Sequence, residues 1–253
     1  MSGRTILITG GSGKFGRLLV QHFINKGDVV VATVRSETSL FEMYSAFAAH
    51  ETQFIGVTCD LSMDRAADKL VEFLSSDGIY PDCLVNNARD LKLCQIQDDG
   101  QISRENFIGE LLLDVVAPYE LTMALAKQNG SRLRRVVNIG SQYGSVAANP
   151  GLYEKPLTQS PLHYGVAKAA LAHLTKELAV RLAPDDIRVN CIAFGGVEGR
   201  VDSEFTKRYA KLSPLGRMLK GSEVTGPVDM LLSEHFTAMT GHVLAVDGGW
   251  TIW

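Results

Sequence analysis

The sequence lacks a long apolar run, an excess of one charge and a cluster of cysteines. No apolar stretch reaches the ~18 residues that a membrane-spanning helix needs, and the first apolar run begins near Thr5, which leaves no room for a signal peptide. Lysine plus arginine (25) nearly balance aspartate plus glutamate (28), so no basic surface for nucleic acid or membrane is expected. We therefore expect a cytoplasmic protein that acts on a small molecule.

The sequence also lacks the spacings typical of metal ligands. Its six histidines are scattered, and its four cysteines have no C-x-x-C pair. Three of the cysteines lie in apolar, strand-like contexts, so all four are expected to be reduced core residues and no metal site is predicted. These cysteines are Cys59, Cys83, Cys94 and Cys191.

Short β-rich runs alternate with segments of helical period along all 253 residues, of which 45% are hydrophobic. Strands are predicted at 4–9, 28–34, 52–58, 82–86, 134–140, 187–193 and 242–246. Because helix-length segments separate them, the strands should form a parallel sheet with right-handed crossovers. The predicted fold class is α/β, a doubly wound parallel sheet of about seven strands with helices on both faces, in one domain spanning 1–253.

A glycine-rich turn follows the first predicted strand, in the stretch ILITGGSGKFGRLLV (6–20). Its glycines fit two spacings, Gly11-x-Gly13-x-x-Gly16 and the longer form that begins at Gly10 and keeps Gly13 and Gly16. Glycine permits the tight turn, and the helix that follows offers free N–H groups to a diphosphate. The stretch predicts a dinucleotide site at the carboxyl ends of the strands.

The segment 160–184 reads as a long helix, with Ser160 at its N-cap and Pro161 in its first position. It places Tyr164 and Lys168 one turn apart on the same face. A phenol is a weak base because its unperturbed pKa is ~10, and a nearby cation favours the phenolate. Ser141, just past a predicted strand, offers a hydroxyl to a substrate oxygen. Proton transfer at Tyr164 is the chemistry that these residues predict.

With these residues the chain resembles a short-chain dehydrogenase/reductase over nearly its whole length. The motifs are TGGSGKFG (9–16), CDL (59–61), VNNA (85–88), NIGS (138–141), YGVAK (164–168), IRVNCIAFGG (187–196) and VDGGW (246–250). The resemblance implies a Rossmann fold and hydride transfer between a nicotinamide cofactor and a substrate carbon. It implies that Tyr164 is the general acid/base, that Ser141 orients the substrate oxygen, and that Lys168 binds the nicotinamide ribose.

The resemblance also implies which residues meet the cofactor. Asp60 and Leu61 would contact the adenine, and Asn87 with Ala88 would flank the adenosine ribose. The full expected set is Gly10, Ser12, Gly13, Lys14, Phe15, Gly16, Arg35, Asp60, Leu61, Asn87, Ala88, Arg89, Tyr164, Lys168, Gly195 and Val197.

The chain departs from the usual family pattern at several positions. Its TGxxGxxG spacing selects Gly10, Gly13 and Gly16, and is associated with longer members that act on nucleotide sugars. Lys14 would extend toward the diphosphate or, as slightly favoured, lie in solvent. Arg89 replaces the glycine of NNAG and would point toward the cofactor or the substrate mouth. Phe194 replaces a proline.

Asp114 also departs from the pattern, because it stands where an asparagine commonly supports a proton-relay water. An ionised aspartate can accept a hydrogen bond from that water but cannot donate one. Asp114 is retained as a candidate for the proton path.

Two segments are expected to shape the substrate mouth. The stretch at about 142–163 is longer than usual between Ser141 and Tyr164, and its tyrosines would form a polar, aromatic wall suited to a sugar, unless the stretch is only a surface excursion. The stretch at about 195–220 is charged and helix-like without a strong apolar stripe, and it is expected to be a lid or a surface helix pair.

NADP(H) is favoured over NAD(H) as the cofactor. NAD sites usually have an acidic residue at the end of the second strand, where this chain has Thr33. Arg35 lies two positions later and could bind a 2′-phosphate, although Glu37 is nearby.

The apolar helices expected at 107–128 and around Tyr164 predict a homodimer or homotetramer, with a covered face of a monomer as the alternative. Two other functions stay open: a dinucleotide-binding scaffold without catalysis, and an epimerase or dehydratase with tightly held NAD(P).

Overall fold

Seven short apolar runs form the strands in the computed structural model, which describes residues 3–253. The strands are β1 (Thr5–Ile8), β2 (Val29–Val34), β3 (Phe54–Thr58), β4 (Cys83–Asn86), β5 (Arg135–Ser141), β6 (Arg188–Phe194) and β7 (Val243–Val246). Each lies within two residues of its predicted bounds, and Ser141 is the last residue of β5 rather than the first one past it. The predicted fold class is confirmed.

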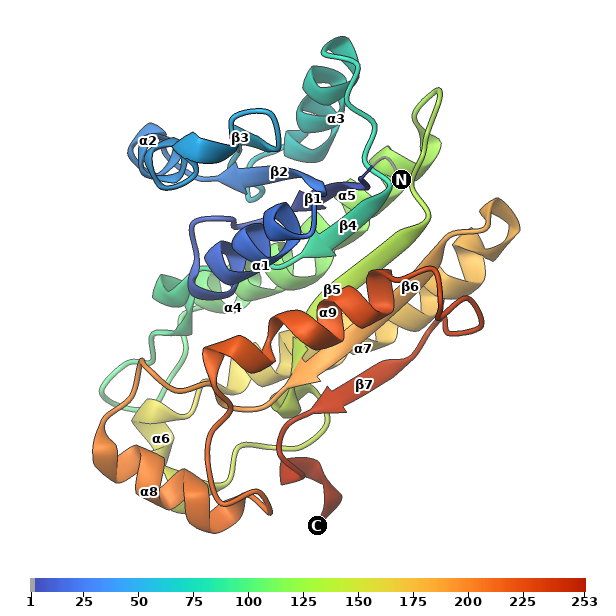
Figure 1. Cartoon of the computed structure of the whole chain (residues 1–253). Helices are drawn as coiled ribbons and strands as arrows, with labels where there is room; N and C mark the ends of the chain where they lie inside the picture. Colours follow the sequence, from blue (N-terminus) through green and yellow to red (C-terminus); the bar gives the residue numbers. More distant parts are fainter. Residues whose placement is uncertain (1–2) are drawn as a thin grey trace.

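All the strands pair in parallel, in the order β3-β2-β1-β4-β5-β6-β7 (Figure 1). The chain first builds outward from β1 to β3 and then returns to place β4 on the other side of β1. The strand order therefore reverses between β1 and β4. In open α/β sheets a ligand binds beyond the carboxyl ends of the strands at this position.

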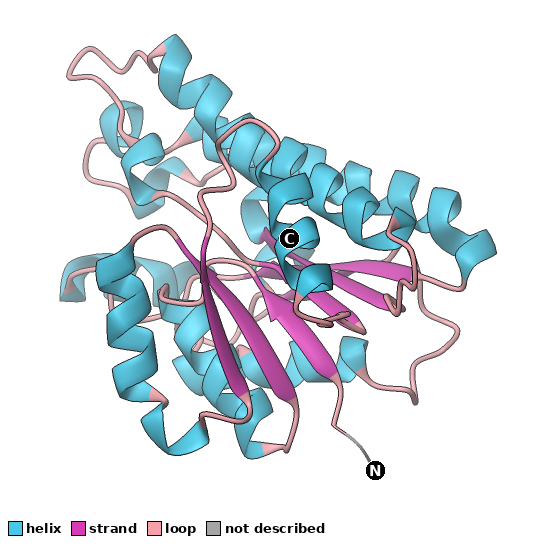
Figure 2. Cartoon of the chain, turned by 90° about the horizontal axis from the view of Figure 1, so that it is seen from above, coloured by secondary structure: helices cyan, strands magenta, loops and turns pink. Residues whose placement is uncertain are grey.

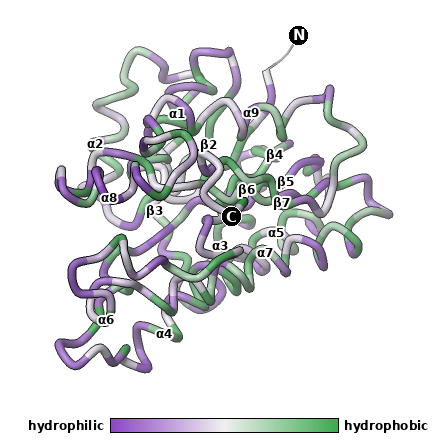
Figure 3. The backbone as a smooth tube through the Cα atoms, turned by 90° about the horizontal axis from the view of Figure 1, so that it is seen from below, coloured by the Kyte–Doolittle hydropathy of each residue, from purple (hydrophilic) through white to green (hydrophobic). Residues whose placement is uncertain are grey.

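Helices cover both faces of the sheet (Figure 2). In β1, the side chains of Ile6 and Ile8 pack with α1, α2 and α9, and Leu7 between them packs with α3, α5 and α7. The helices are α1 (Lys14–Asn25), α2 (Glu37–Ala46), α3 (Ala66–Ser76), α4 (Arg104–Leu111), α5 (Ala117–Lys127), α6 (Pro156–Gln159), α7 (Leu162–Leu182), α8 (Ser203–Leu212) and α9 (Thr225–Leu232). Because both faces of the central strands are buried, most of their residues are apolar, and green stretches occur beside the labels of the strands in Figure 3.

The helix predicted at 107–128 is divided into α4 and α5 by a π-helical turn, Leu112–Val116. Pro118 has no N–H to donate to the carbonyl of Asp114 in an α-helical pattern, which accounts for a wider turn at this point. The turn contains Asp114 and directs its side chain inward, where it is 2% exposed.

Helix α7 begins at Leu162, so the predicted capping by Ser160 is wrong. Pro161 occupies the N-cap with a ψ of 85°, outside the helical region, and no side chain caps the helix. Ser160 instead ends α6, because its N–H donates to the carbonyl of Pro156 across 3.1 Å. Tyr164 and Lys168 nevertheless lie one turn apart, as predicted.

The four cysteines do not all lie in the core, contrary to the prediction. Cys83 and Cys191 are buried in the sheet, but Cys59 and Cys94 are only half-buried, so the prediction of four core cysteines is wrong for these two. Cys94 leaves the core because it lies in a short 3-10 turn after β4. Within residues 3–253, no helix combines the length and the apolarity needed to cross a bilayer.

Candidate active site

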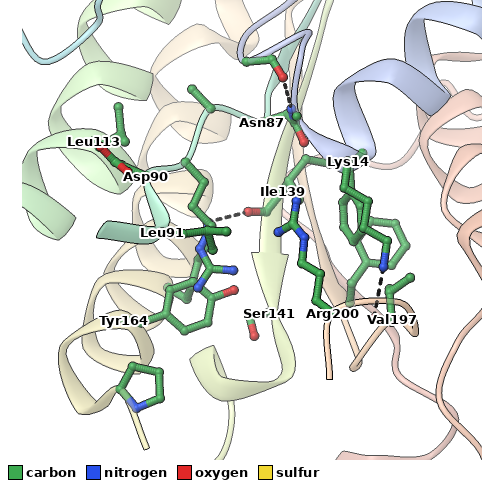
Figure 4. Close-up of a pocket in the computed structure, with 18 of the residues that line it drawn as sticks. Lys14, Asn87, Asp90, Leu91, Leu113, Ile139, Ser141, Tyr164, Val197 and Arg200 are labelled. Carbon is green, nitrogen blue, oxygen red and sulfur yellow. Dashed lines mark hydrogen bonds between the residues drawn. The ribbon is translucent and has the colours of Figure 1, made fainter. Parts of the chain in front are cut away.

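A cavity of about 890 Å³ lies along the carboxyl ends of the central strands (Figure 4). Its wall includes Gly10 after β1, Asn87 after β4 and Ser141 at the end of β5. All the site residues predicted from the sequence line this cavity except Gly16 and Asp114, which lie behind its wall. The fold thus brings residues from the whole length of the chain to one space.

The glycine turn forms one end of the cavity. Gly10 has a φ of +67°, which favours glycine, and a Cβ on Gly16 would lie 2.2 Å from the carbonyl oxygen of Gly10. Gly13 is the N-cap of α1, is exposed and has no side chain to block the approach of a ligand. No side chain caps α1 and no acidic residue lies in its first turn, so its free N–H groups fit a diphosphate.

The ends of β1 and β4 are tied together beside this turn. The Thr9 hydroxyl accepts hydrogen bonds from the backbone N–H groups of Asn87 and Ala88, each across 2.9 Å. The Asn87 amide donates to the carbonyl oxygens of Thr9 and Gly10 across 2.8 and 3.2 Å (Figure 4). These bonds hold the switch point of the sheet in a fixed shape.

Lys14 lines the cavity and is partly buried, and its ammonium contacts the loop after β6. Its ammonium donates to the backbone carbonyl of Val197 across 3.2 Å and also to that of Glu198 (Figure 4). Partial burial lowers the pKa of Lys14, and the positive charge of Arg200 adds to this effect. Lys14 thus connects the glycine turn to the loop after β6, a role that the sequence analysis missed.

Arg35 lies at the β2 end of the cavity, next to Asp90. It follows Val34, the last residue of β2, while Thr33 points back and accepts a hydrogen bond from the Gly10 N–H across 3.3 Å. The Arg35 guanidinium forms an ion pair with Asp90. This pairing, together with the Lys92 N–H, lowers the pKa of Asp90 although burial acts in the opposite direction.

Tyr164, Lys168 and Ser141 form the opposite wall, where α7 meets the end of β5. Figure 4 shows the Tyr164 hydroxyl pointing toward Ser141. The Lys168 ammonium lies 5.6 Å from the centre of the Tyr164 ring and donates to the carbonyl of Ile139 across 2.8 Å. The Ser141 hydroxyl accepts a hydrogen bond from the Tyr143 N–H across 3.2 Å.

A buried polar chain fixes α7 against the sheet. The Asn86 amide donates to Asn138 across 2.8 Å, and the Asn138 amide donates to the Thr175 hydroxyl across 2.9 Å. Because unpaired polar groups are costly in the interior, this chain favours a single placement of α7. The positions of Tyr164 and Lys168, which lie on α7, are fixed in the same way.

Behind the wall, Lys168 forms an ion pair with Asp114, with 2.9 Å between Nζ and Oδ1. Burial alone would lower the pKa of Lys168, but the charge of Asp114 and the neighbouring Tyr164 raise it above its ordinary value, so the amine stays charged. The second oxygen of Asp114 has no hydrogen-bond partner within residues 3–253. It borders a cavity of about 10 Å³, close to the space that one water needs.

The segments predicted as substrate loop and lid pack against each other. The Tyr143 and Tyr153 hydroxyls lie 2.9 Å apart in the loop, and both residues line the cavity. Burial is the main cause that raises the pKa of Tyr143 and of Tyr153. The Arg208 guanidinium in α8 donates to the Leu152 carbonyl across 2.8 Å, so the two segments form one wall.

Helix α8 has an apolar stripe, contrary to the prediction. Phe205, Tyr209 and Leu212 recur at helical spacing and pack with Leu152 and Trp250. The stripe is short and one member is a tyrosine, so the charged residues around it hide it in the sequence.

The residues after β6 are held by both α1 and α8. Phe194, which replaces the usual proline, packs edge-on against Phe15 with 5.5 Å between ring centres. The Tyr209 hydroxyl accepts from the Gly196 N–H across 2.8 Å and donates to Gln142 across 3.0 Å. Gly195 has no room for a side chain, since a Cβ there would lie 2.7 Å from the Asp247 backbone.

Comparison with known proteins decides the family. Residues 15–251 match the family model described as enoyl-(acyl carrier protein) reductase. The chain is a member of the short-chain dehydrogenase/reductase family. It is 29% identical to a tropinone reductase homolog of Arabidopsis thaliana, covering all of this chain and 92% of the relative. It is 28% identical to the 3-oxoacyl-(acyl-carrier-protein) reductase of Haemophilus influenzae, covering 98% of both chains.

Solved structures of similar short-chain dehydrogenases/reductases include complexes with both nicotinamide cofactors. The short-chain dehydrogenase of Leptospira borgpetersenii with bound NAD+ superposes with a TM-score of 0.86 at 29% identity, over 99% of this chain and 94% of that one. The RhlG complex with NADP of Pseudomonas aeruginosa has a TM-score of 0.82 at 25% identity, over 99% and 97%. The chain is an oxidoreductase of this family, and a nicotinamide dinucleotide is its cofactor class.

The surroundings of Arg89 were not predicted from the sequence. The Arg89 guanidinium donates to the Cys94 thiol across 3.1 Å, and that thiol donates to the Glu110 carboxylate across 3.0 Å. The buried His163 contacts the Leu93 carbonyl across 2.6 Å and holds the same turn. These residues come from separate helices and a loop, so no local spacing connects them.

Proposed function

We propose that the chain transfers a hydride between NADP(H) and the carbonyl or alcohol carbon of a small metabolite. The observation that carries this proposal is the arrangement of Ser141, Tyr164 and Lys168 on one wall of the cavity whose other end is the glycine turn. A cofactor along this cavity would place its nicotinamide ring between these residues and the substrate. The bound cofactor would supply or accept the hydride.

In the proposed reaction, the Tyr164 hydroxyl donates a proton to the substrate oxygen during reduction and accepts one during oxidation. The Ser141 hydroxyl donates a hydrogen bond to the same oxygen. Lys168 stays charged beside Asp114, favours the phenolate electrostatically and has one further N–H for a cofactor ribose. Asp114 holds Lys168 in place and stabilises its charged form.

The proposed preference for NADP(H) rests on Arg35. The cavity-lining residues of β2 and of the segment that follows it are Thr33, Val34, Arg35, Ser36 and Ser39, none of which is acidic. A 2′-phosphate would compete with Asp90 for the Arg35 guanidinium, which is 53% exposed and accessible to a ligand.

A hydroxyl-rich substrate, such as a sugar or a sugar-like metabolite, suits the lining of the loop. The loop contributes an amide and two phenols to the lining of the cavity, from Gln142, Tyr143 and Tyr153. Such a lining can donate to and accept from hydroxyl groups while packing against a sugar ring.

We also propose that two copies of the chain pair through α4, α5 and α7. Apolar residues are exposed on these helices and on the π-helical turn between α4 and α5: Ile108, Val116, Tyr119, Val166 and Val180. Sedimentation should show a dimer or tetramer, and a 27.5 kDa species alone at micromolar concentration would contradict the proposal.

Replacement of Tyr164 by Phe tests the proposed reaction. A screen of carbonyl compounds with NADPH first identifies a substrate, and Tyr164→Phe should then lose about a hundred-fold or more in turnover with cofactor affinity nearly unchanged. Tyr80→Phe removes a phenol that does not line the cavity and should behave as the parent. Full turnover in Tyr164→Phe would refute the proposed role, and no turnover with any compound would favour the scaffold function.

A further inference from the structure

Arg89 lies directly against the proposed catalytic tyrosine. It follows the end of β4, and its guanidinium carbon lies 4.1 Å from the centre of the Tyr164 ring. At this distance the cation is attracted to the face of the ring. A positive charge is therefore held beside the hydroxyl that would exchange a proton with the substrate oxygen.

The Arg89 guanidinium has most of its donors free. A guanidinium carries five N–H donors, and the one side-chain partner of Arg89 within residues 3–253 is the Cys94 thiol, a weak acceptor. Several other arginines of the chain pair with carboxylates, as Arg17 does with Glu42 and Arg217 does with Glu223. Arg89 takes part in no ion pair of the described chain.

The charges around Tyr164 do not cancel. Lys168 is paired with Asp114 across 2.9 Å. Glu110 is linked to Arg89 only through the Cys94 thiol, and burial, with the charge of Asp114 adding to it, raises the pKa of Glu110. The charge of Arg89 is therefore left for a ligand, and the cavity is open to one at this point.

We propose that Arg89 binds a carboxylate of the substrate, so that the substrate is an oxo acid or hydroxy acid. This inference rests on the proposed function, because it takes the reacting oxygen to lie at the Tyr164 hydroxyl. The Arg89 guanidinium lies over the Tyr164 ring. A carboxylate one or two carbons from the reacting carbon would therefore reach it and accept two parallel N–H hydrogen bonds. Together with the polar loop, this points to a hydroxyl-rich acid.

The test uses small carboxylates and neutral counterparts of the same size. The protein is first loaded with NADPH, or with NADH if only that binds, and then titrated calorimetrically with oxamate, oxamide, succinate and succinamide. At least one carboxylate should bind at least about ten-fold more tightly than its amide counterpart.

Two variants locate this binding. Arg89→Met replaces the aliphatic stem by an unbranched apolar side chain, removes the charged guanidinium and should weaken carboxylate binding about ten-fold or more. Lys92→Met removes another cation that lines the cavity and should leave carboxylate binding unchanged. Arg89→Lys keeps the charge without the fork, should give intermediate binding and serves as the test if Arg89→Met does not fold.

Several results would overturn the inference. If the amides bind as tightly as the carboxylates, or if the carboxylates bind Arg89→Met as tightly as the parent protein, then Arg89 does not bind the carboxylate group. If Arg89→Met weakens cofactor binding as much as carboxylate binding, Arg89 contacts the cofactor instead of the substrate. Failure of the parent protein to bind either cofactor would overturn the proposed function itself, which the loading step reveals separately.

Discussion

Lys168 and Asp114 form an ion pair in the interior, with 6% and 2% of their side chains exposed. The pair joins α7 to the π-helical turn and lies directly behind Tyr164. Two charges removed from water are tolerated only while each compensates the other. The position of the proposed catalytic lysine therefore depends on a carboxylate that does not itself line the main cavity.

Replacement of Asp114 by Ala should lower the free energy of unfolding by about 3–5 kcal/mol, because it leaves the Lys168 charge buried without a partner. Asp114→Asn should cost less, since the amide oxygen can still accept a hydrogen bond from Lys168. Urea denaturation measures both, with Asp98→Asn as an exposed control. Equal stability of Asp114→Ala and the parent would show that the pair is not formed.

Glu110 should make stability fall with rising pH. Burial and Asp114 raise its pKa in the folded state, whereas an unfolded glutamate titrates near ~4.3. The folded state thus binds the proton more tightly, and this contribution is present below ~4.3 and lost as the pH rises through the folded pKa.

Glu110→Gln removes this loss, so the variant should gain stability relative to the parent as the pH rises from about 4 to 8. Denaturant unfolding at several pH values measures the difference. The exposed Glu51→Gln should follow the parent at each pH. A constant difference between Glu110→Gln and the parent would contradict the raised pKa.

Arg35→Ala should weaken NADPH binding by about ten-fold or more and leave NADH binding nearly unchanged, because only NADPH has a 2′-phosphate to pair with the guanidinium. Asp90→Asn frees Arg35 from its ion pair and should tighten NADPH binding. Calorimetric titration of both cofactors measures these changes. The preference for NADP(H) would be refuted by equal losses for the two cofactors in Arg35→Ala.

Gly16→Ala should disrupt the glycine turn, because the new Cβ would lie 2.2 Å from the Gly10 carbonyl oxygen and 2.7 Å from that of Gly11. Both obstacles are backbone, so a loss of about 1–3 kcal/mol in stability and weaker cofactor binding are expected. Gly226→Ala in α9 meets no atom within 4 Å and should be neutral or stabilising. If Gly16→Ala and Gly226→Ala have the same stability and cofactor affinity, the turn is not closely packed at Gly16.

The strands and the glycine turn could be predicted because their signals are local. The apolar run of β1, the glycines at 10, 13 and 16, and the Tyr164–Lys168 spacing each lie within a few residues of one another. Parallel strands then place their carboxyl ends together, so the side of the sheet that carries the site follows from the fold class.

Contacts between distant segments could not be predicted in this way. Lys14 bonds to the carbonyl of Val197, 183 residues later, and Arg35 pairs with Asp90, 55 residues later. Neither pair has a spacing that marks it in the sequence. The pairing of Asp114 with Lys168 was not predicted either. The family pattern suggested that a water, and not Lys168, would contact the side chain of Asp114.

A titration with NADPH and, separately, NADH tests the central claim most directly. Thermal unfolding follows the protein as each cofactor is added, and a ligand at a hundred times its dissociation constant adds ~2.7 kcal/mol of stability. We expect a clear rise in melting temperature with NADPH and a smaller one, or none, with NADH. No rise with either cofactor would contradict the account, because the cavity would then not hold the group on which the proposed chemistry depends.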